Sequence, residues 1–157
     1  MLTKVIYLGL LASVLSCSAL VEERRAGSCT VVDDPVGSYG TLEVNCPELN
    51  FTLLYDNSPD GRDPLILSME GIDGERVRSK RIEPFSVKTG DGETLSGWAY
   101  REEWRVGGHR LTAHEYFVNG GTACYEEEER AVIRLHLKGS DITLLNYYRE
   151  ETDCGGT

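Results

Sequence analysis

The sequence predicts an all-β protein: an antiparallel β-sandwich or barrel of about eight strands, cross-linked by two disulfides. Three observations predict this class. Apolar and polar residues alternate with a period of two through most of the chain, and no stretch has the spacing of an amphipathic helix. Glycine-rich turn signals separate these stretches at short intervals. Four cysteines follow a segment typical of export, and an even number of cysteines in an exported chain indicates disulfides.

The N-terminal segment has the features of an export signal. Lys4 precedes an apolar run at 5–15 that is too short to span a bilayer, and the small residues at 16–19 suit a signal peptidase. We therefore expect a signal peptide at 1–19, a pro-segment at 20–25 that ends in Arg24-Arg25, and a single β domain at 26–157. The alternative is a bacterial envelope lipoprotein anchored through Cys17, because residues 14–17 resemble a lipobox.

The expected strands follow one another in hairpins. Residues 41–46 and 51–55 alternate apolar and polar side chains, and 56–61 is a strong loop signal. Alternation resumes at 65–69, and 75–87 indicates one or two strands broken near Pro84. The remaining strands are expected at 94–106, 109–118, 126–137 and 142–149, separated by turns at 107–108, 119–121 and 138–141.

Aromatic residues mark one face of the clearest hairpin. Trp98, Tyr100 and Trp104 share a face of the 94–106 strand, and Gly107-Gly108 turns the chain. We interpret this aromatic face as half of a sandwich core, with a carbohydrate platform as the alternative.

Four cysteines remain after removal of the signal peptide, and the sequence alone permits three pairings. We favour Cys29–Cys46 and Cys124–Cys154, because each joins neighbours in sequence across a plausible hairpin. No cysteine pair has the close spacing of a zinc site, and the three histidines form no ligand pattern. We therefore expect no metal and no cofactor.

The net charge of −10 argues against nucleic acid as the partner and against docking on anionic lipid. No segment after the signal is long and apolar enough to span a membrane.

The basic segment 76–81 stands out in this acidic chain. We expect this segment either to pair with the acidic quartet 126–129 within the fold or to contact an anionic partner. We interpret the quartet itself as the solvent-exposed start of a strand.

Two side chains suggest a catalytic alternative. Arg134 and His136 share the polar face of one strand, and Glu102, Glu103 or Glu115 could face them from the neighbouring hairpin. A cation, a histidine and a carboxylate, here Arg134, His136 and Glu115, are the groups that a ribonuclease needs.

Two further features are weaker. His109 and His114 lie five residues apart in one strand, so they should point to opposite faces and share no site. Asn50 begins a glycosylation sequon.

The signal, the segment 21–25 and Cys29 together resemble the N-terminal layout of small secreted fungal proteins that a dibasic-specific protease trims. These include cysteine-stapled β effectors and allergens such as the Alt a 1-like group. The resemblance implies a secreted, effector-like, non-enzymatic protein with a role in virulence, which engages a host or extracellular protein or glycan. Residues 28–33 followed by Cys46 are similar to hairpins of some bacterial lipoproteins. A ribonuclease-like hydrolase and an envelope lipoprotein remain the alternatives.

Overall fold

The computed structural model describes residues 21–57, 65–122 and 124–154. The predicted signal peptide 1–19, with Cys17, and positions 58–61 of the predicted loop lie outside the described residues. The strands are β1 (Glu22–Ala26), β2 (Cys29–Val36), β3 (Tyr39–Asn45), β4 (Asn50–Asp56), β5 (Ile66–Glu70), β6 (Gly74–Lys88), β7 (Thr94–Val106), β8 (His109–Gly120), β9 (Tyr125–Leu137) and β10 (Ser140–Asp153).

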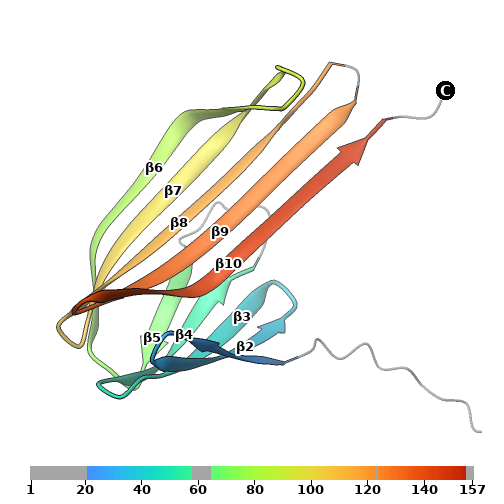
Figure 1. Cartoon of the computed structure of the whole chain (residues 1–157). Coiled ribbons are helices and arrows are strands. Elements are labelled where there is room, and N and C mark those ends of the chain that lie inside the picture. Colours follow the sequence, from blue (N-terminus) through green and yellow to red (C-terminus); the bar gives the residue numbers. More distant parts are fainter. Residues whose placement is uncertain (1–20, 58–64, 123, 155–157) are drawn as a thin grey trace, which may run out of the picture.

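The strands form two antiparallel sheets, each of which is a simple meander. The smaller sheet has the order β1-β2-β3-β4-β5, and the larger sheet has the order β10-β9-β8-β7-β6. Figure 1 shows the smaller sheet lying beneath one end of the larger sheet, near the β7–β8 and β9–β10 turns. The predicted all-β fold with two disulfides is therefore confirmed. Among the described residues, no helix is long and apolar enough to cross a membrane.

The described strands number ten, against about eight expected, because β1 and β2 were not predicted as strands. The sequence of β2 contains Asp33-Asp34-Pro35, which has the composition of a turn, yet these residues pair with β3. Strand β6 is continuous across Pro84, with a shift of register between Ile82 and Phe85.

The core lies between the two sheets and is built from alternate residues of each strand. Val31, Leu42 and Leu53 of the smaller sheet and Ile133 and Leu135 of the larger sheet are completely shielded from solvent.

The aromatic face of β7 belongs to the interior, as the core interpretation expects. Trp98 and Trp104 are only 8% and 7% exposed, and Trp98 stacks on Phe117 with ring centroids 6.1 Å apart. Trp104 is therefore a core side chain and Trp98 is buried beside Phe117, so neither indole is an exposed platform for a carbohydrate.

Both predicted disulfides form. Cys29–Cys46 joins the first residue of β2 to the residue after β3, and Cys124–Cys154 joins the residue before β9 to the residue after β10. Each bond links chain segments that are already neighbours in a sheet, so both close local loops.

Strand β1 contains most of the predicted pro-segment. Its residues pair with β2 from Glu22 to Ala26. The Arg24 guanidinium also donates hydrogen bonds to the backbone carbonyls of Thr143, at 3.1 Å, and Leu144. These carbonyls lie where the pairing of β10 with β9 shifts register. In this structure β1 is an integral strand of the smaller sheet.

The basic segment 76–81 lies in β6, at a free edge of the larger sheet. The acidic quartet lies in β9, and β7 and β8 separate the two strands. The prediction that these segments pair within the fold was therefore wrong, because strand order depends on the whole meander. An exposed edge strand resists unwanted pairing with another chain through positive charge, irregular register and proline. Strand β6 has all three, since its register shifts after Arg76 and it contains Pro84.

Candidate functional site

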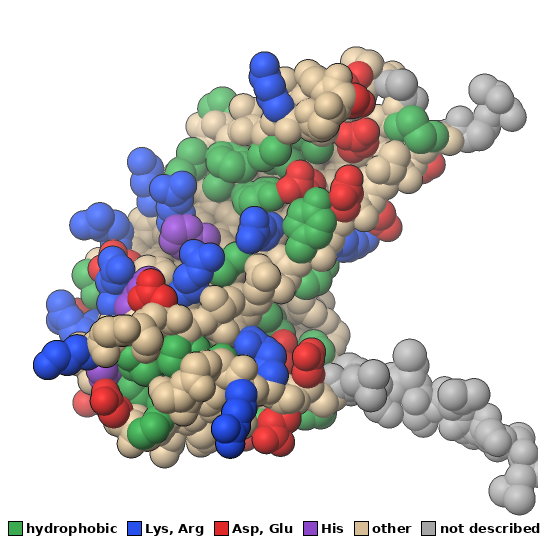
Figure 2. Space-filling view, in the orientation of Figure 1, with side chains coloured by type: hydrophobic (Ala, Val, Ile, Leu, Met, Phe, Trp, Pro, Cys, Tyr) green, Lys and Arg blue, Asp and Glu red, His purple; other side chains and the backbone are tan. Residues whose placement is uncertain are grey.

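The outer face of the larger sheet, directed away from the smaller sheet, gathers positively charged side chains. Residues on this face alternate with the buried core residues along each strand, which sets their direction. We call this surface the basic face; it comprises Arg78, Lys80, Arg101, Arg105, Arg110, Arg130 and Arg134, together with His114 and His136. In Figure 2 basic side chains and histidines gather over part of this sheet, and acidic side chains lie toward its other end.

Most cations of the basic face have no acidic partner. Arg105 lies 3.3 Å from Glu75, whereas Arg78, Lys80, Arg101, Arg110, Arg130 and Arg134 form no ion pair with any described carboxylate. Glu103 is the acidic residue at the middle of the face, and it sits opposite Arg78 in the register of β6 and β7. Six unpaired cations on one face are unexpected in a chain of net charge −10.

A shallow hollow of ≈ 240 Å³ lies within the basic face. Arg130, Val132 and Arg134 contribute one row of side chains from β9, and His114 and Tyr116 contribute a second row from β8. Val132 is 8% exposed and provides an apolar floor between the two arginines. The hollow thus combines two guanidinium groups with a small apolar surface.

The environment of the hollow determines the charge of His114. Burial lowers the pKa of His114, and the nearby Arg101 and Arg134 lower it further. The imidazole is therefore neutral near pH 7, and it can both donate and accept a hydrogen bond. On the same strand, the Tyr116 hydroxyl donates a hydrogen bond to Glu128 and its ring packs against Phe85, with centroids 5.5 Å apart.

His136 is held by two neighbours on the outer face. Its Nδ1 lies 2.7 Å from Asp141 Oδ1, and its Nε2 lies 2.9 Å from Thr112 Oγ1. Both ring nitrogens are engaged, so the ring is fixed in orientation.

The structure brings together only part of the predicted catalytic trio. Arg134 and His136 share the outer face, but Glu115 points to the inner face, where it is buried. Glu102 also lies on the inner face, and Glu103 is the carboxylate that shares the outer face with Arg134, across Thr112. The arrangement of Arg134, His136 and Glu115 therefore does not form one site.

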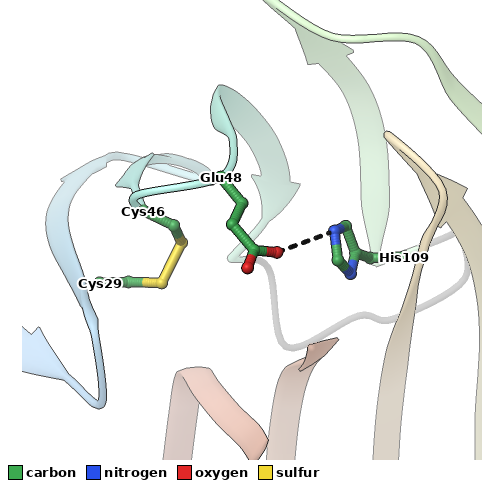
Figure 3. The surroundings of a disulfide bond; sticks show 4 residues. All are labelled: Cys29, Cys46, Glu48 and His109. Atoms are coloured by element: carbon green, nitrogen blue, oxygen red, sulfur yellow. Dashed lines mark ion pairs between the residues drawn. A yellow bond between two sulfur atoms is a disulfide. The ribbon is translucent and has the colours of Figure 1, made fainter. Parts of the chain in front are cut away.

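His109 and His114 lie on opposite faces of β8, as the alternation predicts. The Nε2 atom of His109 approaches Glu48 Oε2 at 3.6 Å. Figure 3 shows these two side chains directed toward each other beside the Cys29–Cys46 disulfide, so that the pair links the smaller sheet to the β7–β8 hairpin.

Three buried glutamates on the inner face were not anticipated from the sequence. Glu102, Glu115 and Glu129 are 2%, 4% and 4% exposed, and one carboxylate oxygen of each has no hydrogen-bond partner among the described residues. Their register places them diagonally across β7, β8 and β9, at the spacing of about 7–8 Å typical of diagonal neighbours. Their burial could have been predicted from the alternation, because each glutamate shares a strand face with apolar residues.

Glu102 has the most partners of the three. It accepts hydrogen bonds from the Ile66 backbone N–H and the Trp104 indole N–H, both at 3.2 Å. Arg76 Nε lies 3.9 Å from its other oxygen, and the Arg76 guanidinium lies over the Trp104 ring. This network ties β5, β6 and β7 together at the sheet interface.

Burial dominates the titration of the other two glutamates. It raises the pKa of Glu115 from 4.5 to about 8, and the neighbouring Glu129 carboxylate adds to the rise. Burial also raises the pKa of Glu129 to about 7, although the Arg149 guanidinium opposes the change. Both side chains are therefore largely protonated at mildly acidic pH.

Within the described part of the chain, no group of histidine, cysteine, aspartate and glutamate side chains is arranged to hold a metal ion. Asn50, the predicted glycosylation site, is exposed at the start of β4. No family model, curated protein or solved structure matches the chain.

Proposed function

We propose that the protein is a secreted, effector-like binding protein that engages an anionic extracellular macromolecule through the basic face, without catalysis. The observation that carries this proposal is the group of six cations on one face of an acidic protein that form no ion pair with a described carboxylate. Like charges on one rigid sheet repel each other, and an anionic partner would relieve that repulsion. The rest of the molecule is negatively charged, and it would repel the same anionic partner.

The rigidity of the sheet supports this role. The cations project from adjacent strands whose opposite sides are fixed in the core by Leu111, Ile133 and Leu135. Binding therefore costs little ordering of the backbone, although the side chains must still be ordered.

Two lysines of β6 give a matched test. Lys80 belongs to the basic face, whereas Lys88 is exposed at the far end of the same strand. We expect the protein to bind an immobilised anionic polymer, with affinity that falls as salt is added. Lys80→Gln and Arg101→Gln should weaken this binding, whereas Lys88→Gln should leave it unchanged. Equal effects of Lys80→Gln and Lys88→Gln, or an absence of binding, would contradict the proposal.

A further inference from the structure

We infer that the hollow between Arg130 and Arg134 is a subsite for one acidic sugar residue of a carboxylated or sulfated polysaccharide. This inference rests on the proposed function and names the chemical class of the partner. It follows from the side chains that line the hollow, from its size and from the arrangement of the cations that lead to it.

The lining of the hollow matches the chemistry of an acidic sugar. Arg130 and Arg134 stand four residues apart on one face of β9, so their Cα atoms are about 13 Å apart. Each planar guanidinium can bind a carboxylate or a sulfate through two parallel hydrogen bonds. Val132 between them offers an apolar surface to the C–H face of a sugar ring. His114, neutral in this environment, can bind a hydroxyl as donor or acceptor.

Other cations form a path to the hollow from the edge of the sheet. Lys80 of β6 is the register partner of Arg101 in β7, and Arg101 is the partner of His114 in β8, at the rim of the hollow. Strands in a sheet are about 4.8 Å apart, so this row crosses about 14 Å from β6 to β9. A linear anionic chain laid across the strands would meet Lys80 and Arg101 and then the hollow.

The same geometry disfavours a nucleic acid. The volume of ≈ 240 Å³ is below the roughly 300–1,000 Å³ of sites for drug-sized ligands, which suits one sugar ring rather than a nucleotide. The Tyr116 ring packs against Phe85, and its hydroxyl is bound by Glu128, so it is not a free stacking platform.

A protein partner also fits less well. The centres of protein–protein interfaces combine arginine with aromatic and methionine side chains, and they are depleted of lysine and glutamate. The centre of this face holds Arg101, Glu103 and Arg134, all projecting from the sheet among polar neighbours. A saccharide, which binds through hydroxyl and acid groups, suits such a surface better.

The test is calorimetric titration of the full secreted protein with four probes: an oligomer of uronic acid, a sulfated oligosaccharide, a neutral oligosaccharide and single-stranded RNA. We expect binding of the uronate oligomer, the sulfated oligosaccharide or both, which identifies the acid group, and no binding of the neutral oligosaccharide. Arg130→Gln and Arg134→Gln should each weaken this affinity about tenfold or more, since each removes charge-assisted hydrogen bonds. Arg25→Gln is the matched control, because Arg25 is exposed on the smaller sheet. The affinity of this variant should equal that of the wild type. Thermal unfolding of each variant establishes that it is folded.

The results separate this inference from the proposed function. Loss of binding in Lys80→Gln and Arg101→Gln, with full affinity in Arg130→Gln and Arg134→Gln, overturns the subsite and leaves the basic face as the binding surface. Equal binding by all variants overturns both. Binding of RNA more tightly than of either acidic oligosaccharide overturns the assignment of the partner as a polysaccharide.

Discussion

Replacement of Glu115 by glutamine should remove a loss of stability that the wild-type protein shows as pH rises. In the folded protein the pKa of Glu115 is about 8, whereas the ordinary value of 4.5 applies to the unfolded chain. Between about pH 4.5 and pH 8 the folded state therefore binds one more proton than the unfolded state, so the free energy of unfolding falls as pH rises. Below this window both states are protonated, and Glu115 contributes no pH dependence.

The size of this effect follows from the difference between the two pKa values. At about 1.36 kcal/mol per pKa unit, the shift from 4.5 to about 8 corresponds to a loss on the order of 5 kcal/mol at the upper end of the window. Glu129, with a pKa of about 7, acts in the same direction. Glutamine has the shape of the protonated acid and cannot ionise, so Glu115→Gln removes the contribution of Glu115.

Guanidinium unfolding followed by tryptophan fluorescence measures this effect, because Trp98 and Trp104 are buried. We expect Glu115→Gln to be about as stable as the wild type near pH 4.5 and more stable by several kcal/mol near pH 8. Glu43→Gln, at an exposed site on β3, should keep the wild-type pH profile. Wild-type stability that rises between these pH values, or a variant weaker than wild type near pH 8, would refute the reasoning. Such a result would mean that Glu115 is ionised and stabilised by a cation.

Four further predictions concern the stability of the domain and its lack of activity on RNA. Cys29→Ser combined with Cys46→Ser should lower the free energy of unfolding by about 3 kcal/mol, because the bond closes a loop with a sequence separation of 17; unchanged denaturation midpoints would contradict this. Arg24→Gln should destabilise the protein by about 1–3 kcal/mol, because the Thr143 and Leu144 carbonyls lose their donor, whereas Arg25→Gln should change stability by under about 0.5 kcal/mol. Cleavage after Arg25, which N-terminal sequencing of the secreted protein would detect as a terminus at Ala26, should destabilise the domain similarly. RNA incubated with the purified protein should stay intact; turnover that is lost in His136→Ala and kept in His109→Ala would instead support the hydrolase.

Local periodicity was sufficient to predict most of the strands. Closeness in sequence favoured the two disulfides that form, although the sequence alone permits three pairings. Alternation along 94–106 and 126–137 reports which residues share a face, since successive side chains in a strand point to opposite sides. It therefore placed Trp104 in the core and separated His109 from His114. It also grouped Arg134 with His136, although it left open which glutamate joins them.

Strand β1 shows a role that the local sequence did not indicate. The dibasic pair at Arg24-Arg25 indicated a processing site, and nothing in the sequence near it predicts a partner for the segment. The donors of Arg24 are satisfied by carbonyls more than a hundred residues away in β10, so its role as a strand residue depends on a distant part of the chain.

Residues close together in the chain were enough to predict the all-β class and the order of the hairpins, and they favoured the pairing of neighbouring cysteines. The packing of the two sheets, which no local pattern predicts, establishes which face of the larger sheet is covered and which strands form its edges. That arrangement buries Glu115 while it exposes Arg134, and it keeps the basic segment of β6 away from the acidic quartet of β9. Alternation defines two faces of a strand equally well, and only the packing of a second sheet removes one of them from water.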